Sequence, residues 1–195
     1  MHSSELLKIL KKTGAMLDGH FLLTSGKHSN VYIEKFRILE KPNILDVVCR
    51  AMADIVKEKD GDFIIGAAIG GILISGGVGR HLGIRHIFSE RINGTMELRR
   101  GFKIRKGQKA IIVEDIITTG GSVFELIQLV NKFEADILHI VNLVDRSSDV
   151  INFGIPSTAL LYLPSESWET DNCPLCKQGI PITERGRTGK KMEII

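Results

Sequence analysis

Two adjacent carboxylates, Glu114 and Asp115, stand directly before a short run of small, hydroxylic and glycine residues that ends in Thr118-Thr119-Gly120-Gly121-Ser122. Glycines let a backbone turn tightly with its N–H groups exposed, and the hydroxyl side chains add further hydrogen-bond donors. Such residues suit the binding of one phosphate group, while the carboxylates can accept hydrogen bonds from sugar hydroxyls. Together they indicate a site for a phosphorylated sugar.

The flanking segments indicate how this site would be held. Ala110-Ile111-Ile112-Val113 is an apolar, mostly β-branched run, which predicts a strand that is buried on both faces and closed by the carboxylates. Residues 123–130 then take up helical spacing, so the positive end of a helix dipole would point at the loop. The alternative is a capped strand-to-helix turn with two solvated carboxylates. The coincidence of three features in one turn argues against that alternative.

The segment 113–122 resembles the phosphoribosyl pyrophosphate (PRPP) motif of type I phosphoribosyltransferases. The resemblance implies that Glu114 and Asp115 hold the ribose 2- and 3-hydroxyls and act in catalysis. It also implies that the following residues hold the 5-phosphate: Ile116, Ile117, Thr118, Thr119, Gly120, Gly121 and Ser122. The implied α/β fold has a mainly parallel central sheet flanked by helices, with a small N-terminal hood and a basic flap.

The composition agrees with one soluble globular domain. The chain has 195 residues, of which 43% are hydrophobic and 25% charged. We expect a single domain over 1–195, with an N-terminal helix and hood hairpin (1–40), a core (60–163) and a C-terminal tail (164–195). No secretory signal is visible and the longest uncharged run, 63–79, is glycine-rich and short for a membrane span, so a cytoplasmic location is expected.

The N-terminal third contains a predicted helix over 3–12, a β-hairpin over 19–34 around a Ser-Gly turn, and a helix over 42–59 in which Cys49 is expected to be buried. The hairpin resembles the hood of the orotate branch of the family. By that resemblance Tyr32 and Ile33 would flank the base. As ordinary hairpin core residues they would have no such role, and the motif alone leaves both interpretations open.

A second buried strand is predicted over 63–68, followed by an exit loop, Ile69-Gly70-Gly71-Ile72. Neither a G-x-G-x-x-G motif nor a P-loop lysine is present, so neither nucleotide fingerprint applies. Glycines at the carboxyl end of a strand still allow backbone amides to approach an anion. The resemblance makes Gly70 and Gly71 part of the pyrophosphate loop.

A third strand, predicted over 86–90, leads into a basic segment that ends at Lys109. This segment has seven bases (Arg91, Arg99, Arg100, Lys103, Arg105, Lys106 and Lys109) against one acid, Glu97. Asn93-Gly94 and Arg100-Gly101 are turn signals, which predicts a two-stranded flap that closes over pyrophosphate, with Arg91 as its best catalytic candidate. A solvated hairpin and a nucleic-acid contact are the alternatives.

A further buried strand is predicted over 135–144 and a last one over 158–163. Arg146 follows the first of them. In the orotate branch an arginine at this place grips the carboxylate of orotate, which suits a bidentate guanidinium, and Thr118 is also assigned to orotate by the resemblance. The alternative is an exposed arginine after a strand.

The tail carries Cys173-Pro174-Leu175-Cys176, which fits a redox pair, half of a zinc site or two thiols near a turn. Because there is no second C-x-x-C and no histidine after His139, the sequence does not favour a complete zinc site, and no protein metal ligand is predicted. A closely similar tail occurs in a thermophile-rich subgroup of the orotate branch.

Three positions depart from the better-known enterobacterial type of the orotate branch. Thr24 and Gly70 stand where that type has lysines, and the residues after Arg91 lack its flap lysines and histidine. Arg99 and Arg100 would then supply the positive charge that these lysines and the histidine provide in that type.

The resemblance implies transfer of the 5-phosphoribosyl group from PRPP to orotate, giving orotidine 5-phosphate and pyrophosphate, in de novo pyrimidine (UMP) biosynthesis. It implies Mg2+ as cofactor and a homodimer with shared active sites. A purine-base transferase, and a PRPP-sensing regulator that binds nucleic acid, are the alternatives. The regulator is not favoured, because aromatic residues make up only 6% of the chain and no helix-turn-helix precedes the domain.

Overall fold

The computed structural model describes residues 1–23, 25–164 and 166–183, and these form two compact units. The larger unit contains Met1–Ala15 and Glu34–Pro164, and the smaller unit combines Met16–Ile33 with the described part of the C-terminal segment. The expected boundaries grouped the N-terminal helix with the hairpin and left the tail separate. Here the tail joins the hairpin because it adds a strand to it.

The larger unit is built on a six-stranded sheet with the strand order β5-β4-β3-β6-β7-β8. Neighbouring strands are parallel except for β4 and β5, which form an antiparallel hairpin. The strands are β3 (Phe63–Ala67), β4 (Arg85–Ile92), β5 (Thr95–Leu98), β6 (Lys109–Ile117), β7 (Asp136–Asp145) and β8 (Ser157–Tyr162). The predicted α/β fold with a mainly parallel sheet is confirmed.

The central strands are buried, as their apolar runs predict. Every residue of β3 is buried, and in β6 burial is unbroken from Ala110 to Asp115. β6 extends past the carboxylates to Ile117, because its pairing with β7 continues as far as Ile117 opposite Asp145. Glu114 and Asp115 therefore lie within the strand rather than at its end.

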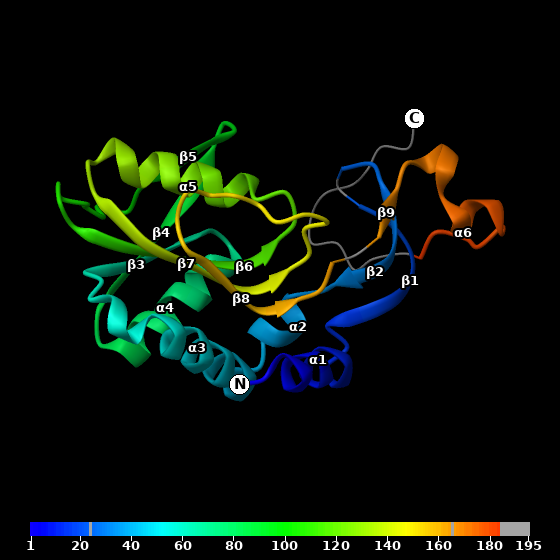
Figure 1. The fold of residues 1–195 in the computed structure, drawn as a ribbon, viewed down its shortest axis with the longest axis horizontal. Helices are drawn as coiled ribbons and strands as arrows, with labels where there is room; N and C mark the ends of the chain where they lie inside the picture. Colours follow the sequence, from blue (N-terminus) through cyan, green and yellow to red (C-terminus); the bar gives the residue numbers. More distant parts are fainter. Residues whose placement is uncertain (24, 165, 184–195) are drawn as a thin grey trace. The chain divides into compact units, whose positions relative to one another are not determined.

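Helices cover both faces of this sheet, with α5 on one face and α3 and α4 on the other (Figure 1). The helices of the larger unit are α1 (Ser3–Lys12), α2 (Phe36–Leu39), α3 (Pro42–Val56), the 3-10 helix η1 (Lys57–Lys59), α4 (Gly70–Leu82) and α5 (Gly121–Lys132). Cys49 on α3 is fully buried, as predicted, and burial raises the pKa of its thiol to about 12. Among the described residues no helix is both long and apolar enough to cross a membrane.

The glycine-rich exit from β3 is a helix start rather than a loop. α4 begins at Gly70, directly after the cis peptide bond between Ala68 and Ile69. A Cβ atom on Gly66 would lie 2.6 Å from the carbonyl oxygen of Gly71. The absence of side chains at these two positions lets the first turn of α4 pack directly on the end of β3.

The smaller unit is a three-stranded antiparallel sheet in which β2 lies between β1 and β9. Its elements are β1 (Met16–Leu22), β2 (His28–Ile33), β9 (Ser167–Trp168), the 3-10 helix η2 (Thr170–Asn172) and α6 (Pro174–Lys177). The hairpin agrees with the sequence prediction, whereas β9, η2 and α6 were not predicted. Each of these three is only two to four residues long, too short for a periodic pattern.

Candidate active site

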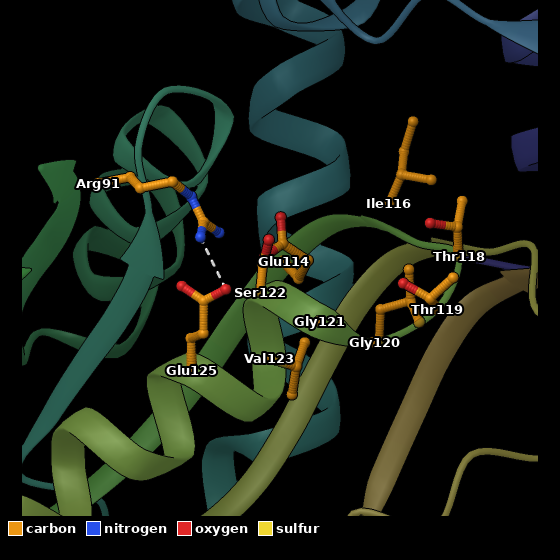
Figure 2. Close-up of a pocket in the computed structure, with 11 residues that line it drawn as sticks. Arg91, Glu114, Ile116, Thr118, Thr119, Gly120, Gly121, Ser122, Val123 and Glu125 are labelled. Atoms are coloured by element: carbon orange, nitrogen blue, oxygen red, sulfur yellow. Dashed lines mark hydrogen bonds and ion pairs between the residues drawn. The ribbon is translucent and has the colours of Figure 1, made fainter. Parts of the chain in front are cut away.

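A pocket of about 220 Å³ lies at the carboxyl end of β6, where the chain turns into α5 (Figure 2). It brings together Arg91, Glu114 and all seven residues predicted to hold the phosphate. Its full lining is Arg91, Glu114, Ile116, Ile117, Thr118, Thr119, Gly120, Gly121, Ser122, Val123 and Glu125. This is the edge of the sheet at which parallel α/β folds bind ligands.

The amino end of α5 forms one wall of this pocket. Among the described residues no side-chain hydrogen bond caps the helix, and its first turn carries no acidic residue, so its first N–H groups are available to an anion. Gly120 precedes the helix with a φ of +76°, and a Cβ atom on it would lie 2.9 Å from the ring of Phe153. Glycine is therefore required there to aim the helix end at the pocket.

Glu114 is the acidic group of the pocket and is only 6% exposed. Its Oε1 accepts a hydrogen bond of 3.0 Å from the backbone N–H of Asp115, while its buried Oε2 has no partner among the described residues. Burial, reinforced by the negative charge of Asp115, raises the pKa of Glu114 to about 8. A hydroxyl donor or a cation in the pocket would satisfy this carboxylate.

Asp115, the next residue of β6, is not among the residues that line this pocket. It is 3% exposed, and its Oδ2 lies 2.7 Å from Nζ of Lys35. A Cβ atom on Gly70 would overlap the same carboxylate oxygen. Asp115 thus lies against the glycine-rich start of α4, which was assigned to pyrophosphate.

Lys35 is a site residue that was not predicted from the sequence. Its Nζ lies 3.4 Å from the position that a Cβ atom on Gly70 would take. A lysine from the segment before α2 therefore places a positive charge beside Gly70, where the resemblance led us to expect a lysine. No local motif marks it, because Lys35 follows the hairpin and reaches Asp115 only through the fold.

Arg91 lines the pocket from β4, and its guanidinium points toward α5 (Figure 2). Its Nη1 lies 2.7 Å from Oε1 of Glu125 and also donates to the carbonyl oxygen of Gly94. Glu125, which was not predicted from the sequence either, lies one turn into α5. Arg100 and Arg99, expected to carry the cationic load, pair instead with Glu90 and Glu97 on the β4–β5 hairpin.

Arg146 follows β7 and is 8% exposed, which differs from the exposed arginine of the alternative interpretation. Its backbone N–H donates to the carbonyl oxygen of Ile117 at 2.8 Å, so it adjoins the turn that was predicted to bind phosphate. Tyr32 belongs to the smaller unit, where its ring centroid lies 5.6 Å from that of Phe21. Its role toward the base stays a prediction, and Thr24 lies outside the described residues.

Residues 36–152 match the phosphoribosyl transferase domain family. The match spans more than half of the chain, so the chain belongs to this family. The orotate phosphoribosyltransferase of Caldicellulosiruptor saccharolyticus is 44% identical over 186 residues, which cover 95% of this chain and 97% of that protein. The orotate phosphoribosyltransferase of Thermotoga petrophila is 44% identical over 184 residues, with coverage of 94% and 98%.

Solved structures agree with this assignment. The orotate phosphoribosyltransferase of Aeropyrum pernix has a TM-score of 0.70 at 25% identity and covers 81% of this chain and 93% of its own. The UMP synthase of Leishmania donovani has a TM-score of 0.72 at 27% identity over 83% of this chain and 36% of its own.

Proposed function

We propose that the protein transfers the 5-phosphoribosyl group from PRPP to orotate, giving orotidine 5-phosphate and pyrophosphate, a step of pyrimidine (UMP) biosynthesis. The observation that carries the proposal is the coincidence, in one pocket, of an uncapped helix end and a buried carboxylate oxygen without a partner among the described residues. A phosphate and a sugar hydroxyl supply the two missing partners. The named relatives, similar over nearly the whole chain, support orotate as the base.

PRPP would lie across the carboxyl ends of β3 and β6. Its 5-phosphate would accept hydrogen bonds from the first turn of α5 and from the hydroxyls of Thr118, Thr119 and Ser122. The ribose diol would donate to the two carboxylates of β6. The pyrophosphate would meet the glycine-rich start of α4 (Gly70 and Gly71), where Lys35 provides a positive charge.

Mg2+ fits this site as a substrate-borne cofactor. Glu114 is buried, and one of its oxygens has no partner in the described part of the chain. Carboxylate oxygen is the hard donor type that Mg2+ prefers, and Asp115 is the next residue. When bound, the ion would neutralise charge on the leaving pyrophosphate. Glu114 and Asp115 are the residues that would hold it.

Cleavage at the anomeric carbon builds oxocarbenium character on the ribose. The buried carboxylates stabilise that positive charge more strongly than exposed ones would, because water does not screen them. Arg91 would contact the departing pyrophosphate after exchanging its partner Glu125 for phosphate oxygens. Orotate brings an acidic ring N–H, so positioning and charge neutralisation are the main demands on the protein.

Orotate would be fixed by Arg146 and Thr118, with Tyr32 beside the ring. Arg146 is buried next to the carbonyl oxygen of Ile117. This position beside the turn supports a role in binding orotate. A bidentate guanidinium distinguishes a carboxylated pyrimidine from purine bases, because a purine offers no carboxylate to it.

We also propose that the protein works as a homodimer with shared active sites. Arg91 lines the pocket of its own chain. The contribution to a neighbouring site would therefore come from the part of the basic flap that follows Arg91 and carries Arg99 and Arg100. These two arginines are exposed and pair only with carboxylates of the same hairpin among the described contacts.

The test is a base panel with PRPP and Mg2+, in which pyrophosphate release is measured with orotate, adenine, guanine, hypoxanthine and xanthine. Release with orotate alone is expected. Release with a purine would replace the orotate assignment by a purine-base transferase. PRPP binding without turnover on any base, together with salt-dependent nucleic-acid binding, would favour a regulator instead.

A further inference from the structure

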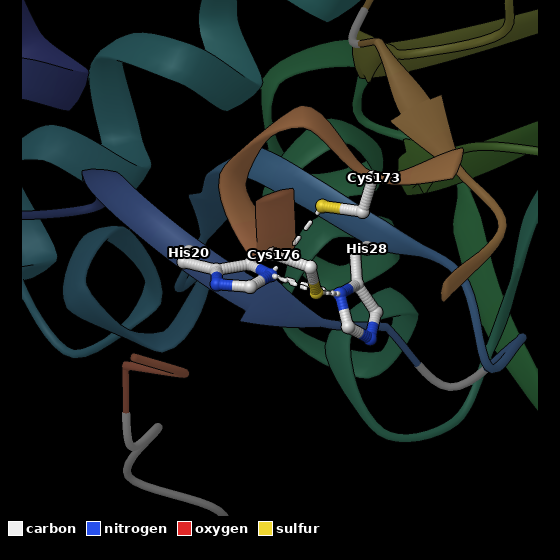
Figure 3. A group of neighbouring side chains, drawn as sticks. All are labelled: His20, His28, Cys173 and Cys176. Atoms are coloured by element: carbon white, nitrogen blue, oxygen red, sulfur yellow. Dashed lines mark hydrogen bonds between the residues drawn. The ribbon is translucent and has the colours of Figure 1, made fainter. Parts of the chain in front are cut away.

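Four side chains of the smaller unit converge on one point although they come from opposite ends of the chain (Figure 3). His20 lies on β1, His28 begins β2, Cys173 precedes α6 and Cys176 lies within it. His28 pairs with Leu22 across the hairpin, and His20 lies two residues before Leu22, where the strand register is irregular. The two imidazole ring centroids are 4.8 Å apart. One potential ligand atom from each residue lies within 4.8 Å of all the others.

The separations between these atoms match those of a tetrahedral metal site. Zinc with Zn–S bonds of about 2.3 Å and Zn–N bonds of about 2.05 Å keeps sulfur and nitrogen ligands about 3.6 Å apart. Nε2 of His20 lies 3.5 Å from Sγ of Cys173 and 3.7 Å from Sγ of Cys176, and Nδ1 of His28 lies 3.3 Å from Sγ of Cys176. The two nitrogens are 2.8 Å apart and would separate by about 0.5 Å around an ion.

The surroundings prepare His20 to be a ligand. Its Nδ1 lies 2.6 Å from the carbonyl oxygen of Ile180. A carbonyl oxygen only accepts hydrogen bonds, so Nδ1 carries the proton and Nε2, which faces the sulfurs, keeps its lone pair. This contact from the far ring nitrogen to a backbone carbonyl is the usual outer shell of a metal-bound histidine.

The burial of these side chains favours a bound metal ion, because without one the buried imidazoles and thiols would be charged or would lack suitable partners. Cys173 is 0%, His20 1% and His28 5% exposed, and Cys176 is exposed at the edge of the cluster. Two thiolates and two neutral imidazoles around a divalent cation form a site with no net charge, which makes burial inexpensive. The sulfur and nitrogen donor set in tetrahedral geometry is the one that zinc prefers among the common divalent metals.

Few apolar side chains are buried among the described residues of the smaller unit. They are Phe21, Ile33 and Cys173, whereas His20, His28 and Ser29 are buried polar residues. Scaffolds below about 70 residues generally need a disulfide, a metal or a similar cross-link, because their cores are too small. Within the described residues the cysteines are free thiols, not a disulfide.

We propose that His20, His28, Cys173 and Cys176 bind one zinc ion, which fastens the C-terminal segment to the β1–β2 hairpin. All four coordination positions are filled by the chain, so the site is structural and has no open position for a substrate. The C-x-x-C pair alone indicates at most half of such a site. The two histidines that complete it lie about 150 residues upstream, as the separations between the paired residues record.

The first test measures metal content in the full chain, purified without a histidine tag and without added metal. Elemental analysis is expected to give about one zinc per chain. Cys176→Ser and His20→Ala should lose most of it, while Cys49→Ala and His86→Ala, which change a cysteine and a histidine outside the cluster, should retain it. Equal zinc content in all five proteins would overturn the proposal.

A second test uses only the unaltered protein, so its outcome does not depend on whether a variant folds. Zinc is removed from the unaltered chain with a chelator under reducing conditions, and Co2+ is added. Tetrahedral cobalt absorption with a thiolate charge-transfer band is expected, and chelation should lower the melting temperature by at least about 5 °C, reversibly with zinc. An unchanged melting temperature without cobalt absorption would refute the site, as would a native Cys173–Cys176 disulfide in peptide mass analysis.

Discussion

Glu114 shows how a single buried carboxyl links the stability of the protein to its site. Its pKa is raised to about 8 from an ordinary value of 4.5, so the folded state holds this proton more tightly than the unfolded state does. Its contribution to stability is complete below pH 4.5 and is lost as the pH rises toward about 8. The unliganded protein therefore carries a stability cost at neutral pH that a bound sugar or cation would relieve.

Replacing Glu114 tests this cost. Glu114→Gln keeps the shape of the side chain and removes the titration, so its melting temperature should decline less than that of the unaltered protein between pH 5 and pH 8, by at least about 3 °C. The variant should also bind PRPP more weakly. Calorimetry at several pH values provides the measurement, and parallel pH profiles for the two proteins would contradict the assigned pKa.

Asp115 is expected to act on the reaction rather than on the fold. Asp115→Asn should lower turnover about a hundredfold with little loss of structure, because it removes a charge near the developing cation. Asp54→Asn, on the exposed side of α3, is the matched control and should leave turnover unchanged. Steady-state kinetics with circular dichroism separate the two effects, and unimpaired turnover of Asp115→Asn would remove Asp115 from the mechanism.

Arg146 is proposed to bind the carboxylate of the base. Arg146→Ala should raise the Michaelis constant for orotate about 10- to 100-fold while changing that for PRPP much less, because it removes a charge-assisted contact to the carboxylate. The two constants are measured by varying each substrate against saturating levels of the other. An effect confined to PRPP would assign Arg146 to the sugar phosphate instead.

At the scale of elements, the turn between β6 and α5 contains two glycines, Gly120 and Gly121, whose structural requirements differ. Gly120 adopts a φ of +76° and lies against Phe153, whereas Gly121 has a helical backbone, and a Cβ atom on it would lie 3.8 Å from Oγ1 of Thr119, an ordinary contact. Gly120→Ala should therefore lower the free energy of unfolding by about 1–3 kcal/mol, and Gly121→Ala by less than about 1 kcal/mol. Chemical denaturation of the two variants measures this contrast, and a loss for Gly120→Ala as small as that for Gly121→Ala would show that the turn tolerates a side chain at Gly120.

These elements also show what can be predicted from the sequence. Long apolar runs such as those of β3 and β6 identify buried strands, and the residues between β6 and α5 carry their chemistry in one contiguous stretch. Lys35, Glu125 and the two histidines of the hairpin could not be found in this way. Their partners are distant in sequence, and only strand register and helix packing bring them together.

The start of α4 illustrates the opposite error. Ile69-Gly70-Gly71-Ile72 reads as a loop because glycine disfavours a helix interior. At the first turn this cost is outweighed, since a side chain on Gly70 would collide with Asp115 and one on Gly71 with Gly66. The close packing of Gly70 and Gly71 against β6 and β3 therefore determines the structure of this segment, whereas helix propensity alone does not.

At the scale of the whole molecule, the placement of Arg91 bears on how two chains would share their sites. Arg91 lines the pocket of its own chain, so a mixture of Arg91→Ala and Asp115→Asn chains should stay inactive, because every site lacks one of the two residues. Had Arg91 served the partner, half of the sites in each mixed dimer would be intact, and about a quarter of the normal activity would return.

The part of the basic flap that follows Arg91 can be tested by a complementary experiment. A double variant, Arg99→Ala with Arg100→Ala, should be impaired alone and should recover about a quarter of normal activity when unfolded and refolded together with Asp115→Asn, if these arginines reach the neighbouring site. The comparison requires that mass measurement finds dimers in both mixtures. Full activity of the double variant alone would mean that neither arginine serves any site, and the catalytic charge would then rest on Arg91 and Lys35 within each chain.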